Sequence, residues 1–257
     1  MRRQILFGMC LAVSVVSSAQ VPAAPADSAG LHVYPSITLP EEKFQWKQLI
    51  VPGALIAVGS FGVSNGWFQS VNHDIRDGMS TLRGDCYFRA DDYLQYVPAA
   101  GYLAAGFIPG VPARHSFKER LCAGVTAYAC MAAITNIVKY AVKEPRPDSS
   151  SRNSFPSGHT ATAFTGAELM RIEYGPWVGA AGYTVALGVA FLRVYNERHW
   201  TNDVIAGAGI GILSAHVGYW LLPLERRCLR GLFKNDMLVA PYADGYSSLG
   251  LTLSATF

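Results

Sequence analysis

The stretch "LRVYNERHWTNDVIAGAGIGILSAHVGYWLL", residues 192–222, joins the end of one apolar segment to the start of another through a polar turn. Its second segment, from Asp203 to Leu222, has the roughly 20 residues that a helix needs to cross a bilayer. Glycines spaced two residues apart in that segment are typical of helices that approach one another closely in lipid. The stretch therefore predicts two membrane helices connected by a polar turn.

Further apolar segments lie upstream, and the composition agrees with a membrane protein. Hydrophobic residues make up 51% of the 257 residues and charged residues only 15%, against about 25% charged residues in soluble domains. The expected helices cover residues 49–63, 93–107, 117–142, 158–174, 178–194 and 203–222. We therefore expect an all-α, membrane-embedded bundle of about six helices.

The regions outside these helices have their own compositions. Residues 1–19 are similar to a signal peptide with a basic start, an apolar run and small residues before a cleavage site after Ala19. An uncleaved anchor helix is the alternative, which the short apolar run disfavours. Residues 20–45 are expected to be a flexible segment, residues 46–228 the helical domain, and residues 229–257 a tail. The polar segment 64–92 is expected to lie flat on the bilayer or over the functional site.

The tail has the period of a strand rather than a helix. In "SLGLTLSATF", residues 248–257, apolar residues alternate with polar or small ones. The preceding "LVAPYA" and the Asp244-Gly245 pair are suited to an antiparallel partner and its turn. A terminal aromatic strand also occurs in outer-membrane barrels, but one hairpin cannot close a barrel. We expect a small C-terminal β-hairpin.

Several classes of function are disfavoured by composition. The net charge of +3, without a basic cluster interleaved with aromatic residues, argues against nucleic acid as a partner. The five cysteines show none of the spacings of metal or redox motifs. Cys122 and Cys130 lie eight residues apart on one expected helix, too far for a disulfide. No metal and no cofactor are predicted.

Three motifs carry the chemistry. "KYAVKEPRP" covers residues 139–147, "PSGH" covers residues 156–159, and an Arg-x5-His-x3-Asp pattern lies within residues 193–203. The first ends one expected helix, the second begins the next, and the third spans the turn between the last two, so all three share one membrane face. The candidate site residues are Lys139, Arg146, Ser157, Gly158, His159, Arg193, His199 and Asp203.

These residue types are suited to binding a phosphate. Lys139, Arg146 and Arg193 can neutralise its non-bridging oxygens, and arginine can do so with two parallel hydrogen bonds. Ser157 and the backbone N–H of Gly158 lie where a helix begins, which is a favourable place for an anion. The glycine also allows the backbone to approach the ligand, because it has no Cβ.

The two motif histidines, His159 and His199, are suited to the reaction steps on such a phosphate. His199 is the expected nucleophile, which gives a phosphohistidine intermediate, and Asp203, one helical turn later, can hold its other ring nitrogen. His159 is placed to protonate the leaving alkoxide and then to activate water. The cations supply the electrostatic stabilisation for which other phosphatases use a metal.

This set of motifs resembles the type 2 phosphatidic acid phosphatase and vanadium haloperoxidase superfamily. The family pattern is Lys-x6-Arg-Pro, then Pro-Ser-Gly-His, then Ser-Arg-x5-His-x3-Asp, and the resemblance covers about residues 90–222. Leu192 replaces the family's serine before the arginine, which affects fine positioning rather than the reaction. The resemblance implies a metal-independent phosphatase on a helical bundle, usually acting on membrane lipids or isoprenoid pyrophosphates.

Other residues have competing interpretations. Lys143 is a weaker candidate than Lys139 for the phosphate ligand, because its spacing to Arg146 does not fit the motif. Arg152 and Arg198 flank the site and are either solvated or in contact with a distal part of the substrate. The histidines outside the motifs are interpreted as ordinary surface or packing residues: His32, His73, His115 and His216.

Charge asymmetry predicts which side of the membrane the site faces. Eight basic residues are expected on the face opposite the motifs: Arg114, Lys118, Arg120, Arg171, Arg226, Arg227, Arg230 and Lys234. The positive-inside rule then places the site on the periplasmic face of a bacterial inner membrane. A cleaved leader leaves the N-terminus outside, whereas six spans with this orientation need it inside, so either residues 49–63 do not cross or the leader is not processed.

The predicted function is a lipid phosphatase with the membrane lipid phosphate as substrate and the bilayer as partner. Candidate substrates are undecaprenyl pyrophosphate, phosphatidylglycerophosphate, phosphatidic acid and the phosphates of lipid A. A periplasmic acid phosphatase acting on soluble phosphate esters is the main alternative. A vanadium-dependent haloperoxidase and a membrane scaffold with an inactive site are further alternatives, which the size of the chain and the complete motifs disfavour.

Overall fold

The computed structural model describes residues 44–229, 236–243 and 249–256, and outside the tail the regular elements among these residues are all helices. The expected signal peptide and nearly all of the expected flexible segment lie outside them. The elements are η1 (Trp46–Leu49), α1 (Ile50–Ser64), α2 (Gly66–Arg83), α3 (Asp91–Leu94), α4 (Val97–Ala104), η2 (Ala105–Phe107), α5 (Phe117–Val142), α6 (Gly158–Tyr174), α7 (Pro176–Tyr195) and α8 (Thr201–Cys228). In the tail, strands β1 (Asp236–Ala243) and β2 (Leu249–Thr256) pair antiparallel.

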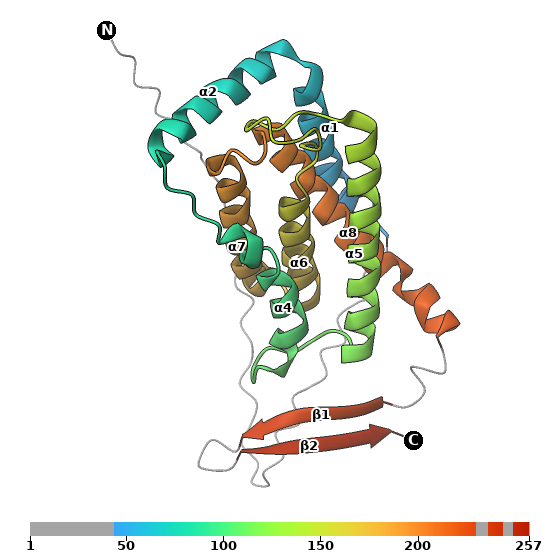
Figure 1. The fold of residues 1–257 in the computed structure, drawn as a ribbon. Coiled ribbons are helices and arrows are strands. Elements are labelled where there is room, and N and C mark those ends of the chain that lie inside the picture. The colour runs from blue at the N-terminus through green and yellow to red at the C-terminus, as the bar shows by residue number, and fades with distance from the viewer. Residues whose placement is uncertain (1–43, 230–235, 244–248, 257) are drawn as a thin grey trace, which may run out of the picture. The chain divides into compact units, whose positions relative to one another are not determined.

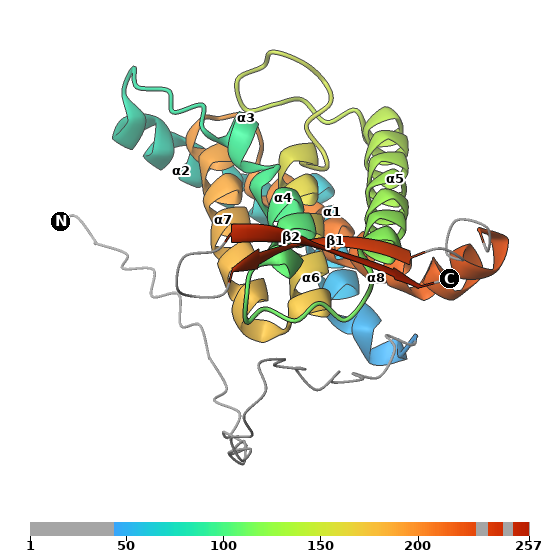
Figure 2. The ribbon, with the colours of Figure 1, turned by 90° about the horizontal axis from the view of Figure 1, so that it is seen from below.

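Helix α6 is the centre of the helical domain. It packs against α4, α5, α7 and α8, as Figures 1 and 2 show. Most of its residues are buried, including Glu168 and Glu173. A helix enclosed by other helices can carry polar residues that a lipid-facing helix cannot, because their hydrogen-bond partners come from its neighbours.

Small residues allow α8 to lie directly against α6. A Cβ added at Gly207 would lie 2.6 Å from Ser157 O, and one at Gly211 would lie 2.5 Å from Ala161 O. Both distances are shorter than any normal contact, so only glycine permits this separation of the two backbones. Gly188 of α7 differs, because a Cβ there would meet nothing within 4 Å.

Four helices among the described residues are long and apolar enough to cross a membrane: Trp46–Ser64, Phe117–Val142, Pro176–Tyr195 and Thr201–Cys228. Their surfaces carry exposed apolar side chains such as Val58, Ile137 and Leu187. Such surfaces are suited to contact with lipid chains. We therefore describe the helical domain as membrane-embedded with several passes.

Two expected helices differ from the prediction. The segment 93–107 is broken into parts of α3, α4 and η2, and α4 has 8 residues, too few to span a bilayer. Pro98 lies in the first turn of α4, and the cap of the preceding α3 is Gln95, so two helices replace one. The last helix was expected to end at Leu222 but continues through Pro223 to Cys228.

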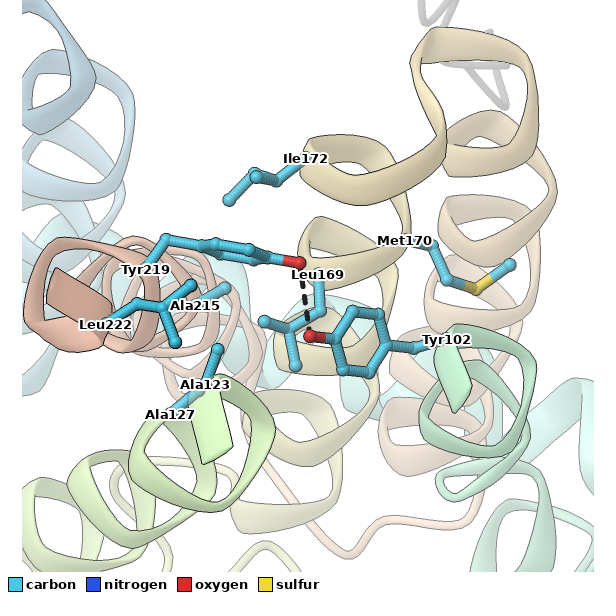
Figure 3. Close-up of a cluster of buried hydrophobic side chains, with 9 residues drawn as sticks. All are labelled: Tyr102, Ala123, Ala127, Leu169, Met170, Ile172, Ala215, Tyr219 and Leu222. Carbon is cyan, nitrogen blue, oxygen red and sulfur yellow. Dashed lines mark hydrogen bonds between the residues drawn. The ribbon is translucent and has the colours of Figure 1, made fainter. Parts of the chain in front are cut away.

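The half of the domain away from the motif residues contains a packed apolar cluster. Figure 3 shows Tyr102 and Tyr219 with Leu169 between helices α4, α6 and α8. The hydroxyl of Tyr219 donates to Glu173 at 2.6 Å, and its oxygen lies 3.1 Å from the hydroxyl of Tyr102. The cluster holds α6 in place through contacts that are independent of the motif residues.

The polar segment 64–92 is largely helical. Asn65 begins α2 as its N-cap, with its side-chain oxygen accepting from Phe68 N at 3.1 Å. Figure 1 shows α2 at the end of the domain where the loop between α5 and α6 and the turn between α7 and α8 also lie. The segment then leads into α3, which contacts α6 and α7.

Candidate active site

The three motifs meet at one end of the helical domain. Lys139 is in the last turn of α5, Ser157 is the N-cap of α6, Arg193 is in the last turn of α7, and Asp203 is in the first turn of α8. Ser157 N donates to the backbone oxygen of Asp203 at 3.0 Å. This bond joins the starts of α6 and α8, and with them the second and third motifs.

His199 and Asp203 form a buried pair. His199 Nδ1 lies 3.3 Å from Asp203 Oδ2, and the two side chains are 2% and 0% exposed. The same carboxylate oxygen accepts from Trp200 N at 2.8 Å and from the hydroxyl of Ser154. Asp203 is thereby held from three directions, and the contact at Nδ1 leaves His199 Nε2 as the ring nitrogen able to react.

The protonation state of His199 follows from its surroundings. Burial lowers the pKa of His199 to about 4, with Asp203 opposing the shift and Arg193 and Lys139 adding to it. The imidazole is therefore neutral near pH 7, which is the form that has a free electron pair on nitrogen.

The cations approach the site from different helices. Lys139 Nζ donates to the backbone oxygens of Asn153 and Ser154 at 2.6 and 3.4 Å, so the lysine also anchors the loop before α6. Among the described residues, the Nε atoms of Arg146 and Arg193 are buried and have no hydrogen-bond partner. Buried donors of this kind require an acceptor, and a phosphate oxygen or an ordered water can supply it.

The start of α6 has the properties of an anion site. Ser157 is fully buried, and its hydroxyl accepts from Thr160 Oγ1 at 3.0 Å and from Thr160 N at 3.5 Å, which leaves its own hydrogen to donate. A Cβ at Gly158 would meet only Thr135 Cγ2, at 3.9 Å. The protein itself thus leaves space beside Gly158, and a ligand can use it.

A polar cavity of about 250 Å³ opens at this end of the domain. Arg146, His159 and Arg193 line it together with Tyr87, Arg89, Asp91, Asp92, Asn196 and Arg198. Arg198, which sequence analysis left between two interpretations, also pairs with Asp148 at 3.0 Å. The cavity brings positive charge from separate parts of the chain to one place.

Two carboxylates in this cavity were not among the residues predicted from the motifs. Arg193 Nη1 lies 2.6 Å from Asp91 Oδ2 and 3.8 Å from Asp92 Oδ1. Asp92 Oδ1 also lies 3.1 Å from His159 Nε2. Neither aspartate belongs to a motif, and no local pattern in "RADDYL" indicates that it reaches residues about 70 to 100 positions later.

These carboxylates are also the residues best placed to hold a metal among the described part of the chain. Asp91, Asp92 and His159 offer ligand atoms that all lie within 4.8 Å of one another. The guanidinium of Arg193 already neutralises Asp91, however, and a dication there would be repelled by it. The donor set therefore fits a metal poorly while Arg193 is in this position.

A third acidic residue, Glu144, was also missed. Burial and the neighbouring Asp203 carboxylate raise the pKa of Glu144 to about 8. Asn202 Nδ2 donates to Glu144 Oε2 at 3.5 Å, and the backbone oxygen of Glu144 accepts from Ser154 N at 2.9 Å. The glutamate lies within the first motif at a position that the motif does not specify.

Two histidines outside the motifs pair with buried carboxylates. His115 Nδ1 lies 2.8 Å from Glu173, and His216 Nε2 lies 2.9 Å from Glu168. Both pairs belong to the part of α6 remote from the motifs. They satisfy the buried carboxylates of the central helix, which is a structural role. His32 lies outside the described residues.

Comparison with known proteins finds a family match for the part of the chain that carries the motifs. The model of the PAP2 superfamily matches residues 120–227, which include every motif residue. This segment is similar to the PAP2 superfamily. This match begins after α4, so α1, α2 and the aspartates of α3 lie outside the matched region.

Individual PAP2 relatives cover different shares of the chain. A lipid A 1-phosphatase of Porphyromonas gingivalis is 40% identical over 160 residues, which are 60% of this chain and 36% of that protein. An undecaprenyl-diphosphatase of Sulfolobus acidocaldarius is 38% identical over 68 residues, 26% of this chain and 32% of that protein. The chain thus spans about a third of the length of these relatives. A phosphatidylglycerolphosphate phosphatase structure from Bacillus subtilis has 18% identity and a TM-score of 0.49, covering 70% of this chain and 97% of that one.

Proposed function

We propose that the protein is a metal-independent phosphatase that hydrolyses membrane lipid phosphates or isoprenoid pyrophosphates through a phosphohistidine. The observation that carries this proposal is the buried His199–Asp203 pair at the same end of the domain as Lys139, Arg146 and Arg193. A neutral imidazole beside unpaired guanidinium nitrogens can both attack a phosphate and stabilise its additional charge.

The reaction proceeds in two displacements. The electron pair of His199 Nε2 forms a bond to phosphorus, and the bond from phosphorus to the leaving oxygen breaks, its electron pair staying on that oxygen. His159 donates a proton to the leaving oxygen and later removes one from the attacking water. That water oxygen bonds to phosphorus as the bond to Nε2 breaks, which releases phosphate and restores the neutral His199. Asp203 stabilises the imidazolium form between the two steps.

Relatives and helices support a lipid as substrate. The lipid A 1-phosphatase and the undecaprenyl-diphosphatase are named for lipid phosphates, and we extend that class to this chain. The candidate spans α5, α7 and α8 each have a motif residue in an end turn, which supports a site close to the bilayer, where such substrates are found. Soluble phosphate esters remain the competing substrates, and detergent dependence separates the two classes.

We further propose that the site faces the periplasm of a bacterial inner membrane. Arg114, Lys118 and Arg227 lie at helix ends opposite the motif end, at the start of α5 and the end of α8. Positive charge at that end is typical of the cytoplasmic side. Lipids with phosphates in the outer leaflet are therefore within reach of the site.

The test is phosphate release from purified lipid phosphates in detergent, with and without EDTA. We expect turnover that survives EDTA and is inhibited by vanadate, which resembles the five-coordinate transition state. His199→Ala should lose at least about a thousandfold in kcat while keeping the native elution volume, because the nucleophile is absent. Loss of activity with EDTA and recovery with Mg²⁺ or Zn²⁺ would overturn the mechanism.

A further inference from the structure

A second cavity, of about 400 Å³, lies beside the catalytic segments. Its walls come from the end of α1, from α2, from the end of α5 with the loop after it, and from Trp200. The residues that matter below are Asn72, Lys143, Glu144, Arg152 and Trp200. None of the eight candidate catalytic and phosphate-binding residues lines this cavity.

The second cavity shares a wall with the first. Arg146 and Arg198 line the first cavity, whereas Pro145 and Trp200 line the second. Trp200 Nε1 donates to the backbone oxygen of Pro145 at 2.8 Å, which joins the two catalytic segments along that wall. Trp200 directly follows His199 in the chain, and the Cα atoms of adjacent residues are about 3.8 Å apart. The second cavity therefore begins one residue away from His199. A group attached to a reacting phosphate is therefore close to it.

The charged residues of this cavity favour an anion. Lys143 and Arg152 have no ion pair or hydrogen bond from their side chains among the described residues. Glu144 lies near them, but burial and Asp203 raise its pKa to about 8, so its carboxyl is mostly protonated and uncharged at pH 7. The two cations are thus not neutralised by the nearest acid.

The neutral groups of the cavity favour hydroxyls. Asn72 is 4% exposed, and its nitrogen donates to Asn202 Oδ1 at 2.7 Å. Among the described residues its oxygen, Oδ1, is buried without a hydrogen-bond partner, which calls for a donor from a ligand or water. Gln69 and the indole of Trp200, packed edge-on against His73 at 4.9 Å, complete a wall of amide and aromatic groups. Polar groups placed in this way can fix the orientation of a bound ligand.

We propose that this cavity binds the hydroxylated headgroup of the lipid whose phosphate reacts at His199, and that Lys143 and Arg152 recognise a second anionic group on that headgroup. The inference rests on the proposed phosphatase function and adds a substrate class, polyol or sugar headgroups that carry their own negative charge. The α1 and α2 walls, with Gln69 and Asn72, lie outside the region that the PAP2 model matches, whereas Lys143 and Arg152 lie inside it.

The experiment compares three substrates with the same hydrocarbon chains and one reacting phosphate. The first carries a sugar headgroup with a second phosphate, the second carries the sugar alone, and the third is a simple alkyl phosphate. In Lys143→Gln and Arg152→Gln, kcat/KM on the first substrate should fall by about tenfold more than on the other two, because only it offers the second charge. Arg227→Gln, at the far end of α8, is the matched control and should change all three substrates equally.

Equal losses on all three substrates would overturn the proposal, as would no loss on the first. Inorganic phosphate distinguishes a free anion from a headgroup. If it displaces the headgroup lipid only at the concentration at which it inhibits the alkyl phosphate reaction, the cavity does not hold a free phosphate separately. A lower displacing concentration, abolished in Arg152→Gln, combined with equal kcat/KM on the first and second substrates, would assign the cavity to free phosphate and refute the headgroup.

Failure of the proposed function would be separately visible. In that case the wild type would hydrolyse none of the three lipids. Binding would then be measured directly, as the dissociation constant of the first lipid for His199→Ala with and without Arg152→Gln. A tenfold weaker binding in the double variant supports the headgroup site without any turnover, and equal binding rejects it. Asn72 is not used as a variant, because its contact with Asn202 also borders Asp203.

Discussion

Asp203 shows how one side chain can organise a site from the third position of a helix. Its Oδ2 accepts from Trp200 N at 2.8 Å, which satisfies a backbone donor at the start of α8, and lies 3.3 Å from His199 Nδ1. The spacing of four residues between His199 and Asp203 puts both on the same side of that first turn. The motif spacing therefore encodes this pair locally, and it is recognisable in the sequence.

Replacing either of the adjacent aspartates Asp91 and Asp92 in the first cavity by asparagine should change the strength of inhibition by vanadate, in opposite directions for the two variants. Asp92 is half exposed, 51%, and stands between His159 and Arg193, where a phosphate oxygen is expected. Removing its charge in Asp92→Asn should tighten inhibition by vanadate by about fivefold, because like charges repel at this distance. Asp91→Asn should weaken inhibition instead, because Asp91 orients the buried Arg193. The inhibition constants of the two variants check this, and weakening in both would refute competition by Asp92.

The low pKa of His199 predicts the pH dependence of activity. Since burial lowers that pKa to about 4, the free enzyme keeps its nucleophile neutral down to that pH. The ionisation of the substrate is measured by ³¹P NMR and corrected for. The corrected kcat/KM should then fall on the acid side near pH 4 rather than near pH 6.5. The same shift makes the folded protein lose stability as pH falls from about 6.5 towards 4, because only the unfolded chain takes up the proton there. A limb at or above pH 6.5 would contradict a buried neutral imidazole.

At the scale of elements, the interface between α6 and α8 depends on particular glycines. A Cβ at Gly207 would lie 2.6 Å from Ser157 O, whereas one at Gly188 of α7 has open space. We expect Gly207→Ala to destabilise the protein by about 1–3 kcal/mol, because backbone atoms must move apart. Gly188→Ala is the matched control and should stabilise α7 by about 0.5–1 kcal/mol through its higher helix propensity. Unfolding in mixed detergent micelles measures both, and equal effects would contradict the packing described here.

Elements also show where local patterns lead to errors. Residues 93–107 are apolar enough to look like a membrane helix, yet they form parts of α3, α4 and η2. Helix α6 is the opposite case. Its acidic residues make it more polar than a typical membrane-spanning helix, yet it is the most enclosed helix of the domain. In both cases the neighbours decide the outcome. Hydropathy describes a segment alone, whereas the cost of a polar group depends on what it contacts.

At the scale of the whole molecule, the orientation of the site is testable with cysteine chemistry. A cysteine at Ser150, which is exposed in the loop between the first two motifs, should react with an impermeant maleimide added to cells with a permeabilised outer membrane. Cys228, exposed at the far end of α8, should stay unlabelled until the inner membrane is broken. Each is tested with the other cysteines replaced. The reverse pattern would place the site in the cytoplasm, and labelling at both positions would favour a domain that does not span the membrane.

The sequence by itself determined the positions of α5, α6 and α7, the beginning of α8 and the motif residues gathered at one end of the domain. Periodicity, proline breaks and short spacings are local, and local signals are readable without a structure. Only the tertiary structure placed Asp91 and Asp92 against Arg193 and His159, and the wall of Asn72 beside Trp200. These contacts join residues far apart in sequence, so no spacing encodes them. They exist because α6, α7 and α8 pack closely enough to bring the turns at their ends, with α2 and α3, to one place.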